Sequence, residues 1–443
     1  MVRLPDSLAR SAPWQLARRY GASTAGPVAV SGAHFVASLI FLHSLTAHEF
    51  GLYSFVMVVV AFAMSLGGAL IVVPITQSLV SGDVATRPAC YRMNWLVCAL
   101  IGAVLALALW ASEAPLREAL LFGLYAAIFA WRWFARSLAY VDGHPHAAVI
   151  SDFVYSALLL TGLPALMLSG HMTFNNGSEM MLLAALAALA PFGRPFLAGQ
   201  LAALKGVLGR NSLTGYRPVF HDVSRWSMIG VIFTEITVNI HAYLVTFISG
   251  ADAFALLALG MLLMRPAALV QSALPDMERP AMARAIAATD LPALEAIARA
   301  FRHGLGAAWI GNILLCAGLL AFVPALILKK GYSLHEVALV AAISAAIMLL
   351  RAVRTPPAVL LQAAGEFRKL AWLAVYSGAV SLVATLGLLL MFGPIPSLGG
   401  VLLGEVAVVL QCRALVARWK RGKAITAKSD AGADAPEVAF AHA

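Results

Sequence analysis

The sequence predicts an all-α polytopic membrane protein of about twelve transmembrane helices in two six-helix bundles. The 443 residues are 61% hydrophobic and only 12% charged, with a mean hydropathy of +0.85, whereas soluble domains are roughly a quarter charged. Twelve apolar runs follow one another, each close to the ~20 residues that a membrane span needs. A basic stretch at 205–223 divides them into six and six. A soluble enzyme, a secreted disulfide scaffold and a disordered chain are therefore excluded.

The apolar runs give the helices in chain order. Inside a bilayer only a helix or a closed barrel pairs every backbone group, so each run is expected to be helical. The expected spans are 26–45, 52–76, 94–111, 117–136, 147–168, 180–204, 224–248, 252–274, 304–328, 336–363, 368–392 and 397–416.

The regions outside the spans complete the predicted organisation. The N-terminal segment 1–25 is expected to be cytoplasmic and lacks the cleavage site of a signal peptide. The first bundle then occupies 26–204 and the second 224–418, with 205–223 as a cytoplasmic linker.

Two further segments of the second half carry predictions of their own. Residues 276–303 interleave charged residues with alanine and leucine, which predicts a pair of cytoplasmic amphipathic helices along the membrane surface. The segment 419–443 is predicted to be a disordered cytoplasmic tail, because it becomes rich in alanine, aspartate and glycine.

The net charge of +10 is distributed unevenly between the two sets of span ends. One set carries nearly all of the lysines and arginines, and the other carries only Arg117, Lys329 and Lys330. The positive-inside rule therefore predicts that both termini are cytoplasmic. The basic ends are also expected to contact anionic membrane lipids. No soluble basic domain is present to bind nucleic acid.

The sequence lacks the motifs of the common enzyme classes. It contains no Walker A sequence, no HExxH and no nucleophile elbow. The four cysteines lack metal-ligand spacing and are expected to be small buried hydrophobic residues. We therefore predict no enzyme activity, no metal and no cofactor. A membrane-embedded glycan polymerase or ligase is the alternative, which the short external loops disfavour.

Arginines within the spans are the candidate binding residues, since a central arginine costs at least ~2.5 kcal/mol on insertion scales. Arg194 stands where Pro191, Gly193 and Pro195 open the helix backbone. A guanidinium binds two oxygens of a pyrophosphate at once and stays charged at any working pH. The candidates are Arg194, Arg265 and Arg351, followed by Arg132 and Arg354. The competing interpretation is that they extend toward the membrane interface.

Acidic residues within the spans are fewer. Glu235 lies centrally in the seventh span, whereas Asp152 and Glu405 lie nearer span ends. A lone membrane carboxylate can carry a proton or bind sodium, so Glu235 is the candidate site for coupling to an H⁺ or Na⁺ gradient. The competing interpretation is that Glu235 is a structural partner of one of the arginines.

Four short motifs resemble those of the polysaccharide (O-antigen type) flippases, a branch of the multidrug/oligosaccharidyl-lipid/polysaccharide (MOP) exporter superfamily. After the first span comes Glu49-Phe50-Gly51-Leu52-Tyr53, and the eighth span closes with Leu274-Pro275. The segment 361–368 resembles the family's turn between spans 10 and 11, and 399–404 resembles the start of its last span. The similarity extends over about residues 20–418. The chain departs from the family at Ala253-Phe254-Ala255, where a glycine is common, and it lacks the extra pair of spans of lipid II flippases.

The resemblance implies a V-shaped pair of six-helix bundles around a central cationic cavity. It also implies a bacterial inner-membrane transporter that flips polyprenyl-pyrophosphate-linked oligosaccharides by alternating access, with a polymerase and a chain-length regulator as partners. Drug antiporters share the superfamily and are the second alternative. The arginines within the spans favour an anionic substrate over a cationic drug.

Overall fold

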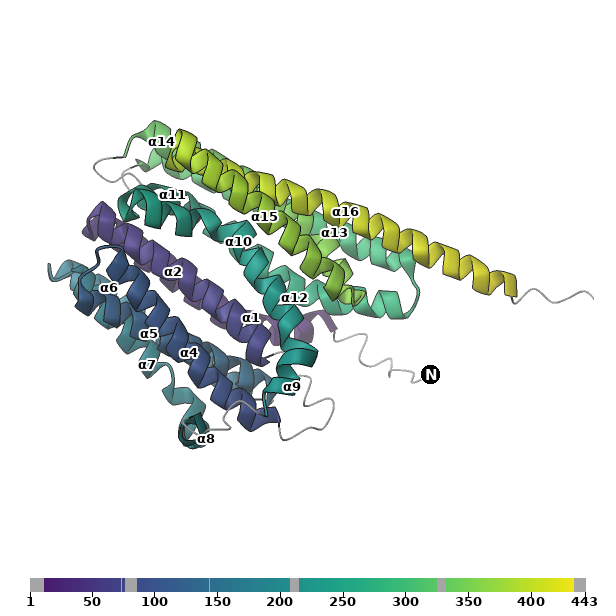
Figure 1. Ribbon diagram of the computed structural model, residues 1–443, viewed down its shortest axis with the longest axis horizontal. Coiled ribbons are helices and arrows are strands. Elements are labelled where there is room, and N and C mark those ends of the chain that lie inside the picture. Colours follow the sequence, from purple (N-terminus) through teal and green to yellow (C-terminus); the bar gives the residue numbers. More distant parts are fainter. Residues whose placement is uncertain are drawn as a thin grey trace, which may run out of the picture.

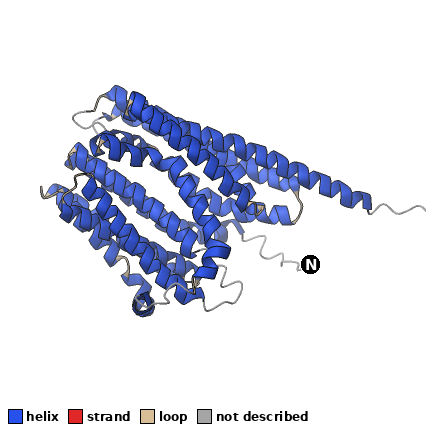
Figure 2. Ribbon diagram, in the orientation of Figure 1, coloured by secondary structure: helices blue, strands red, loops and turns tan. Residues whose placement is uncertain are grey.

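The computed structural model of the protein describes residues 12–72, 74–75, 86–142, 144–207, 215–324 and 332–433. All regular elements in these ranges are helices (Figures 1 and 2). The first half comprises α1 (Ala12–Ser44), α2 (Ala47–Gly67), the π-helical turn η1 (Gly68–Val72), α4 (Thr86–Ala111), α5 (Leu116–Val141), α6 (Pro145–Leu168), α7 (Phe174–Ala187), the 3-10 turn η2 (Ala190–Phe192) and α8 (Gly193–Val207).

The second half follows the same pattern after a short connection. It comprises α9 (Arg217–Val219), the π-helical turn η3 (Phe220–Ser224), α10 (Arg225–Ser249), α11 (Ala251–Leu263), α12 (Arg265–Ala287), α13 (Leu291–Phe322), α14 (Leu334–Ala363), α15 (Phe367–Phe392) and α16 (Pro394–Ala433). Helix α1 begins and α16 ends at the same end of the bundle (Figure 1). We call this the basic end, because Arg87 stands at the start of α4 and Arg284 in the last turn of α12.

The helix lengths confirm the prediction of about twelve spans. Among the described residues, eleven helical segments are long and apolar enough to cross a membrane. The broken segment of α11 and the first part of α12, bent by 58°, gives a twelfth. Each expected span overlaps one of these segments. The Lys329–Lys330 pair lies outside the described residues.

Two predicted segments of the second half are helical where the structure describes them. The segment 276–303 comprises the end of α12 and the start of α13, which a turn at 288–290 separates. Its apolar residues Met282, Leu294 and Phe301 pack in one cluster with Leu360 of α14 and Trp419 of α16. The segment 419–443, predicted to be a tail, begins within α16, which extends to Ala433, and residues 434–443 lie outside the described residues.

The two halves contact each other most closely where α2 and α11 begin, opposite the basic end. A capping box of Thr46 and Glu49 starts α2. Phe50 and Phe254 belong to one apolar core that joins both halves. A Cβ added to Gly51 would lie 1.9 Å from the carbonyl oxygen of Ala251. Only glycine permits this approach, which explains the glycine of the Glu49–Tyr53 motif.

We expect Gly51→Ala to weaken the contact between the halves by about 1–3 kcal/mol, because the methyl group must displace backbone atoms. The melting temperature of the purified protein in detergent should fall accordingly. Gly67→Ala in the same helix is the control, because a Cβ there meets nothing within 4 Å. Equal melting temperatures for the two variants would contradict this account of the contact.

Candidate functional site

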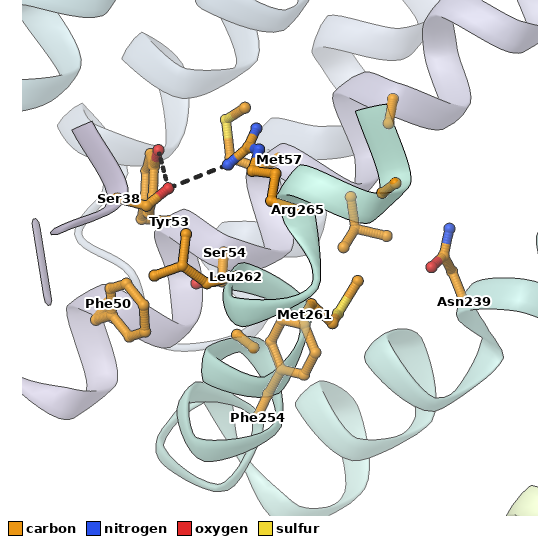
Figure 3. Close-up of a pocket in the computed structure, with 14 residues that line it drawn as sticks. Ser38, Phe50, Tyr53, Ser54, Met57, Asn239, Phe254, Met261, Leu262 and Arg265 are labelled. Atoms are coloured by element: carbon orange, nitrogen blue, oxygen red, sulfur yellow. Dashed lines mark hydrogen bonds between the residues drawn. The ribbon is translucent and has the colours of Figure 1, made fainter. Parts of the chain in front are cut away.

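A cavity of about 190 Å³ lies between the two halves, next to the contact of α2 and α11 (Figure 3). Its walls come from α1 and α2 of the first half and from α10, α11 and α12 of the second. Most of the lining is apolar, with Phe50, Met57, Phe254 and Met261 among its larger side chains. Because both halves contribute, any relative movement of the halves would change the shape of this cavity.

Arg265 supplies the positive charge of the cavity. It is the first residue of α12, directly after the bend that follows α11, and Pro266 fixes the start of the new helix. Its Nη1 donates a hydrogen bond to Ser38 Oγ of α1 at 3.3 Å (Figure 3). Ser38 Oγ donates in turn to the carbonyl of His34 at 2.7 Å and lies 3.1 Å from the Tyr53 hydroxyl.

Arg265 therefore connects the two halves through neutral partners only. No carboxylate lies within 4.0 Å of it among the described residues. A guanidinium has five N–H donors in a planar fork, and one hydrogen bond to a hydroxyl leaves most of them available. The site therefore combines apolar walls with one cation that has spare donors for an anionic group.

The arginines of α5 are held away from the cavity by a buried ion-pair trio. Arg132 Nη2 and Arg136 Nε lie 2.5 and 2.9 Å from the two oxygens of Asp152 in α6. Arg132 also donates to Ser151 Oγ at 3.0 Å, and its guanidinium stacks on Tyr155 at 4.8 Å from the ring centroid. Its side chain is 1% exposed. The structure thus places Arg132 in the interior of the first half and not at the cavity.

The arginines of α14 form a matching trio in the second half. Arg351 Nε and Arg354 Nε lie 2.8 and 2.7 Å from the two oxygens of Glu405 in α16, and that carboxylate is fully buried. Arg351 also donates to the carbonyl of Val238 in α10 at 3.1 Å. In both halves, two arginines of the fourth span share one carboxylate, so each trio keeps a surplus positive charge.

Glu235 lies beside the cavity. Its Oε1 accepts hydrogen bonds from Asn239 Nδ2 at 3.1 Å and from the Tyr243 hydroxyl at 2.7 Å. Asn239 itself lines the cavity (Figure 3). Asn239 therefore connects the carboxylate of Glu235 to the cavity through a single hydrogen bond. The hydrogen-bond partners of Glu235 among the described residues are neutral, and Arg351 acts on its carboxylate only through a longer-range electrostatic interaction.

Arg194 is not brought together with the other candidates. The predicted opening of the helix backbone is present, because η2 and Gly193, with φ of +78°, separate α7 from α8. Arg194 follows on the exposed side of α8, a helix that packs on α4 in the first half, and it does not line the cavity between the halves. A separate cavity of about 620 Å³ does lie at this break, lined by Pro191, Phe192 and Pro195, but Arg194 is not among its lining residues.

The sequence does not single out Ser38 or Asn239. Each is a small polar residue in an apolar span, a pattern that also fits helix packing. Tyr53, which also lines the cavity, is part of the Glu49–Tyr53 motif. The described residues contain no group of three or more histidine, cysteine, aspartate or glutamate side chains that could hold a metal ion.

Comparisons with known proteins show which solved structures share this fold. No protein-family profile and no curated protein matches the sequence. An inward-facing multidrug resistance MATE family transporter of the MOP superfamily superimposes with a TM-score of 0.63 at 13% identity, covering 88% of this chain and 96% of that chain. A mutant of the Vibrio cholerae MATE transporter VcmN gives a TM-score of 0.61 at 16% identity, covering 94% and 97% of the two chains.

A third solved structure also superimposes on this chain. A MOP superfamily transporter from Pyrococcus furiosus, described as having a binding pocket of reverse polarity that suggests a different function, gives a TM-score of 0.54 at 12% identity, covering 90% of this chain and 95% of that chain. Identities this low establish the fold and not the substrate. The chain therefore is a multi-pass membrane protein with the fold of MATE transporters.

Proposed function

We propose that the protein is a secondary transporter that binds an anionic, amphipathic substrate in the cavity between its two halves. The observation that carries this proposal is Arg265, a cation at the cavity with no carboxylate partner among the described residues. The substrate class that fits is a polyprenyl-pyrophosphate-linked oligosaccharide, which the protein flips across the bacterial inner membrane. A pyrophosphate supplies oxygens for the guanidinium, and the polyprenyl chain matches the apolar walls.

Alternating access follows from the position of Arg265. The residue begins α12 in the second half and reaches Ser38 in the first, so its hydrogen bond forms only when the halves are close. A pyrophosphate that binds the guanidinium would replace this hydrogen bond to a neutral hydroxyl by a stronger ion pair. Substrate binding and the relative position of the halves are thereby linked, as a flippase requires.

The charged trios set the polarity around the cavity. The trio of Arg132, Arg136 and Asp152 and that of Arg351, Arg354 and Glu405 are each positive by one charge. Because the interior of a protein screens charge weakly, these surpluses contribute to the potential at the cavity without contacting the substrate. Arg351 and Arg354 are therefore proposed as long-range contributors, and Arg132 as a structural one.

The drug antiporter is the second candidate, and two observations favour it. Two of the superimposed structures are MATE transporters, one of them a multidrug resistance protein. Glu235 also offers a carboxylate within one hydrogen bond of the cavity, where a lipophilic cation could be bound. Arg265 is the feature that opposes this assignment, since it would repel such a cation.

A deletion strain separates the two candidates. Loss of a flippase should deplete surface polysaccharide and cause lipid-linked repeat units to accumulate, with drug sensitivity unchanged, and the wild-type gene should restore the polymer. Normal polysaccharide together with increased sensitivity to cationic drugs would establish the antiporter and contradict the proposal. A polymerase and a chain-length regulator are the expected partners, and chain extension by the purified protein alone would identify an enzyme.

Glu235 is the proposed site of coupling to an H⁺ or Na⁺ gradient. We expect Glu235→Gln to bind substrate as the wild type does but to lose gradient-driven transport in proteoliposomes by about tenfold or more, because the amide cannot exchange a proton or bind sodium. Glu179→Gln, at the exposed ion pair with Arg117, is the matched control and should transport normally. Unchanged gradient dependence in Glu235→Gln would remove this residue from the coupling mechanism.

A further inference from the structure

A second cavity lies within the second half, between α13, α14 and α16 near the basic end. It encloses about 550 Å³ and shares no lining residue with the cavity between the halves. We call it the α13–α14–α16 groove. Its apolar wall is formed mainly by α14, with Leu349, Val353, Pro356 and Leu360. The groove is open to the surrounding medium, because Arg299, Arg302 and Arg413 on its rim are exposed.

The rim of the groove carries an excess of positive charge. The lining includes Arg299 and Arg302 of α13, Arg413 and Lys420 of α16, and a single acid, Glu295. Lys420 Nζ pairs with Glu295 Oε1 at 2.6 Å. The three arginines form no ion pair with any described residue, and only Arg302 has a hydrogen bond, from Nε to the carbonyl of Ala298 at 3.2 Å.

The first half provides an internal comparison. Its third and fourth spans are α4 and α5, its sixth comprises α7, η2 and α8, and a groove of about 620 Å³ is lined by residues of α4, α5, η2 and α8. The arginine that lines that groove, Arg87, forms an ion pair with Asp142, which also lines it. The unpaired arginines of the second half are thus not a general consequence of the fold.

We infer that the α13–α14–α16 groove binds an anionic phospholipid. The lipid phosphate lies among Arg299, Arg302 and Arg413, whose guanidinium groups match phosphate oxygens in geometry and charge. One acyl chain follows the apolar wall of α14 from Leu360 toward Leu349, deeper in the bundle. By the positive-inside rule, the basic end lies at the headgroups of the cytoplasmic leaflet. The arginines of the rim are therefore at the depth of the lipid phosphates, and the apolar wall is at the depth of the acyl chains.

Lipid binding to the purified full-length protein tests this inference. Native mass spectrometry from mixed micelles of phosphatidylglycerol and phosphatidylcholine should show preferential retention of phosphatidylglycerol by the wild type. Replacing Arg299, Arg302 and Arg413 together by Gln should weaken phosphatidylglycerol binding by about tenfold or more, because the groove then lacks the guanidinium groups that bind the lipid phosphate. Replacing Arg217, Arg284 and Arg418 by Gln removes the same charge from the same end outside the groove and should leave binding unchanged.

A second pair of variants tests the apolar part of the groove without removing charge. Gly306 lines the groove and Gly311 lies farther along α13, and a Cβ at either position meets nothing within 4 Å. Gly306→Leu should fill the groove and weaken phosphatidylglycerol binding, whereas Gly311→Leu should not. Both variants gain helix propensity, so neither is expected to unfold.

Three results would overturn the inference. The first is equal retention of phosphatidylglycerol and phosphatidylcholine by the wild type. The second is an equal loss of binding in the groove variant and in the control variant. The third is full displacement of the lipid by excess inorganic phosphate, which would assign the rim to a free anion. The experiment measures lipid binding alone, so its outcome is independent of the transported substrate.

Discussion

Replacing Asp152 by Asn is expected to destabilise the protein by about 3–5 kcal/mol, the usual loss when one partner of a buried ion pair is removed. The carboxylate neutralises Arg132 and Arg136 at 2.5 and 2.9 Å, and Arg132 is only 1% exposed. The amide would leave two guanidinium groups without a counter-charge inside the first half. The melting temperature in detergent should fall by more than in any other single variant of the first half described above, and the yield of folded protein should drop with it.

The exposed ion pair of Arg117 and Glu179 is the control for this prediction. Glu179→Gln removes a carboxylate from a pair of similar length, 2.6 Å, in which Arg117 is 70% exposed. Such pairs contribute about 0–1 kcal/mol, so this variant should melt close to the wild type. Replacing Arg132, Arg136 and Asp152 together by apolar residues should recover much of the lost stability. A wild-type melting temperature for Asp152→Asn would contradict a structural role for the trio.

Replacing Arg265 by Gln is expected to abolish transport while leaving the fold intact. A hydrogen bond to a charged group contributes about 1.5–3 kcal/mol, which corresponds to roughly a 10- to 150-fold loss of substrate affinity. Stability should change little, because Arg265 has neutral partners and its removal leaves no carboxylate unpaired. Arg265→Lys should retain part of the activity, since it keeps the charge and loses the planar fork.

Arg194→Gln is the matched control for Arg265, as a second arginine next to a proline at a helix break. Its exposed position on α8 predicts transport close to that of the wild type. Flux can be followed in proteoliposomes with a fluorescent lipid-linked sugar pyrophosphate. Normal flux in Arg265→Gln, or a loss in Arg194→Gln as large as in Arg265→Gln, would show that the substrate is not bound where we propose.

The span pattern was predictable from the sequence because hydropathy and proline and glycine positions are local properties. The break before Arg194 and the Glu49–Tyr53 motif at the start of α2 were visible for the same reason. The partners of the arginines were not, since Asp152 lies 20 residues from Arg132, and Glu405 lies 54 residues from Arg351. Pairing across that distance depends on how helices rotate about their axes in the bundle, which the apolar pattern of a membrane span specifies weakly.

The same limit explains why the sequence does not distinguish Arg194 from Arg265. Depth along a span can be read from residue numbers, but the side of the helix that faces the other half cannot. Arg194 and Arg265 are both next to a proline at a helix break, and only Arg265 lies on a helix that lines the contact between the halves. The helices at 276–303 were anticipated from their composition, whereas their packing on α14 and α16 required tertiary structure.

Equilibrium binding to the purified protein tests the central claim most directly. A short polyprenyl pyrophosphate, the corresponding uncharged polyprenol and the lipophilic cation tetraphenylphosphonium would be compared on the wild type and on Arg265→Gln. We predict that the pyrophosphate binds most tightly to the wild type and loses about tenfold or more in affinity in Arg265→Gln, while polyprenol binding stays the same. Preferential binding of tetraphenylphosphonium, with an affinity that rises in Arg265→Gln, would contradict the assignment of an anionic substrate.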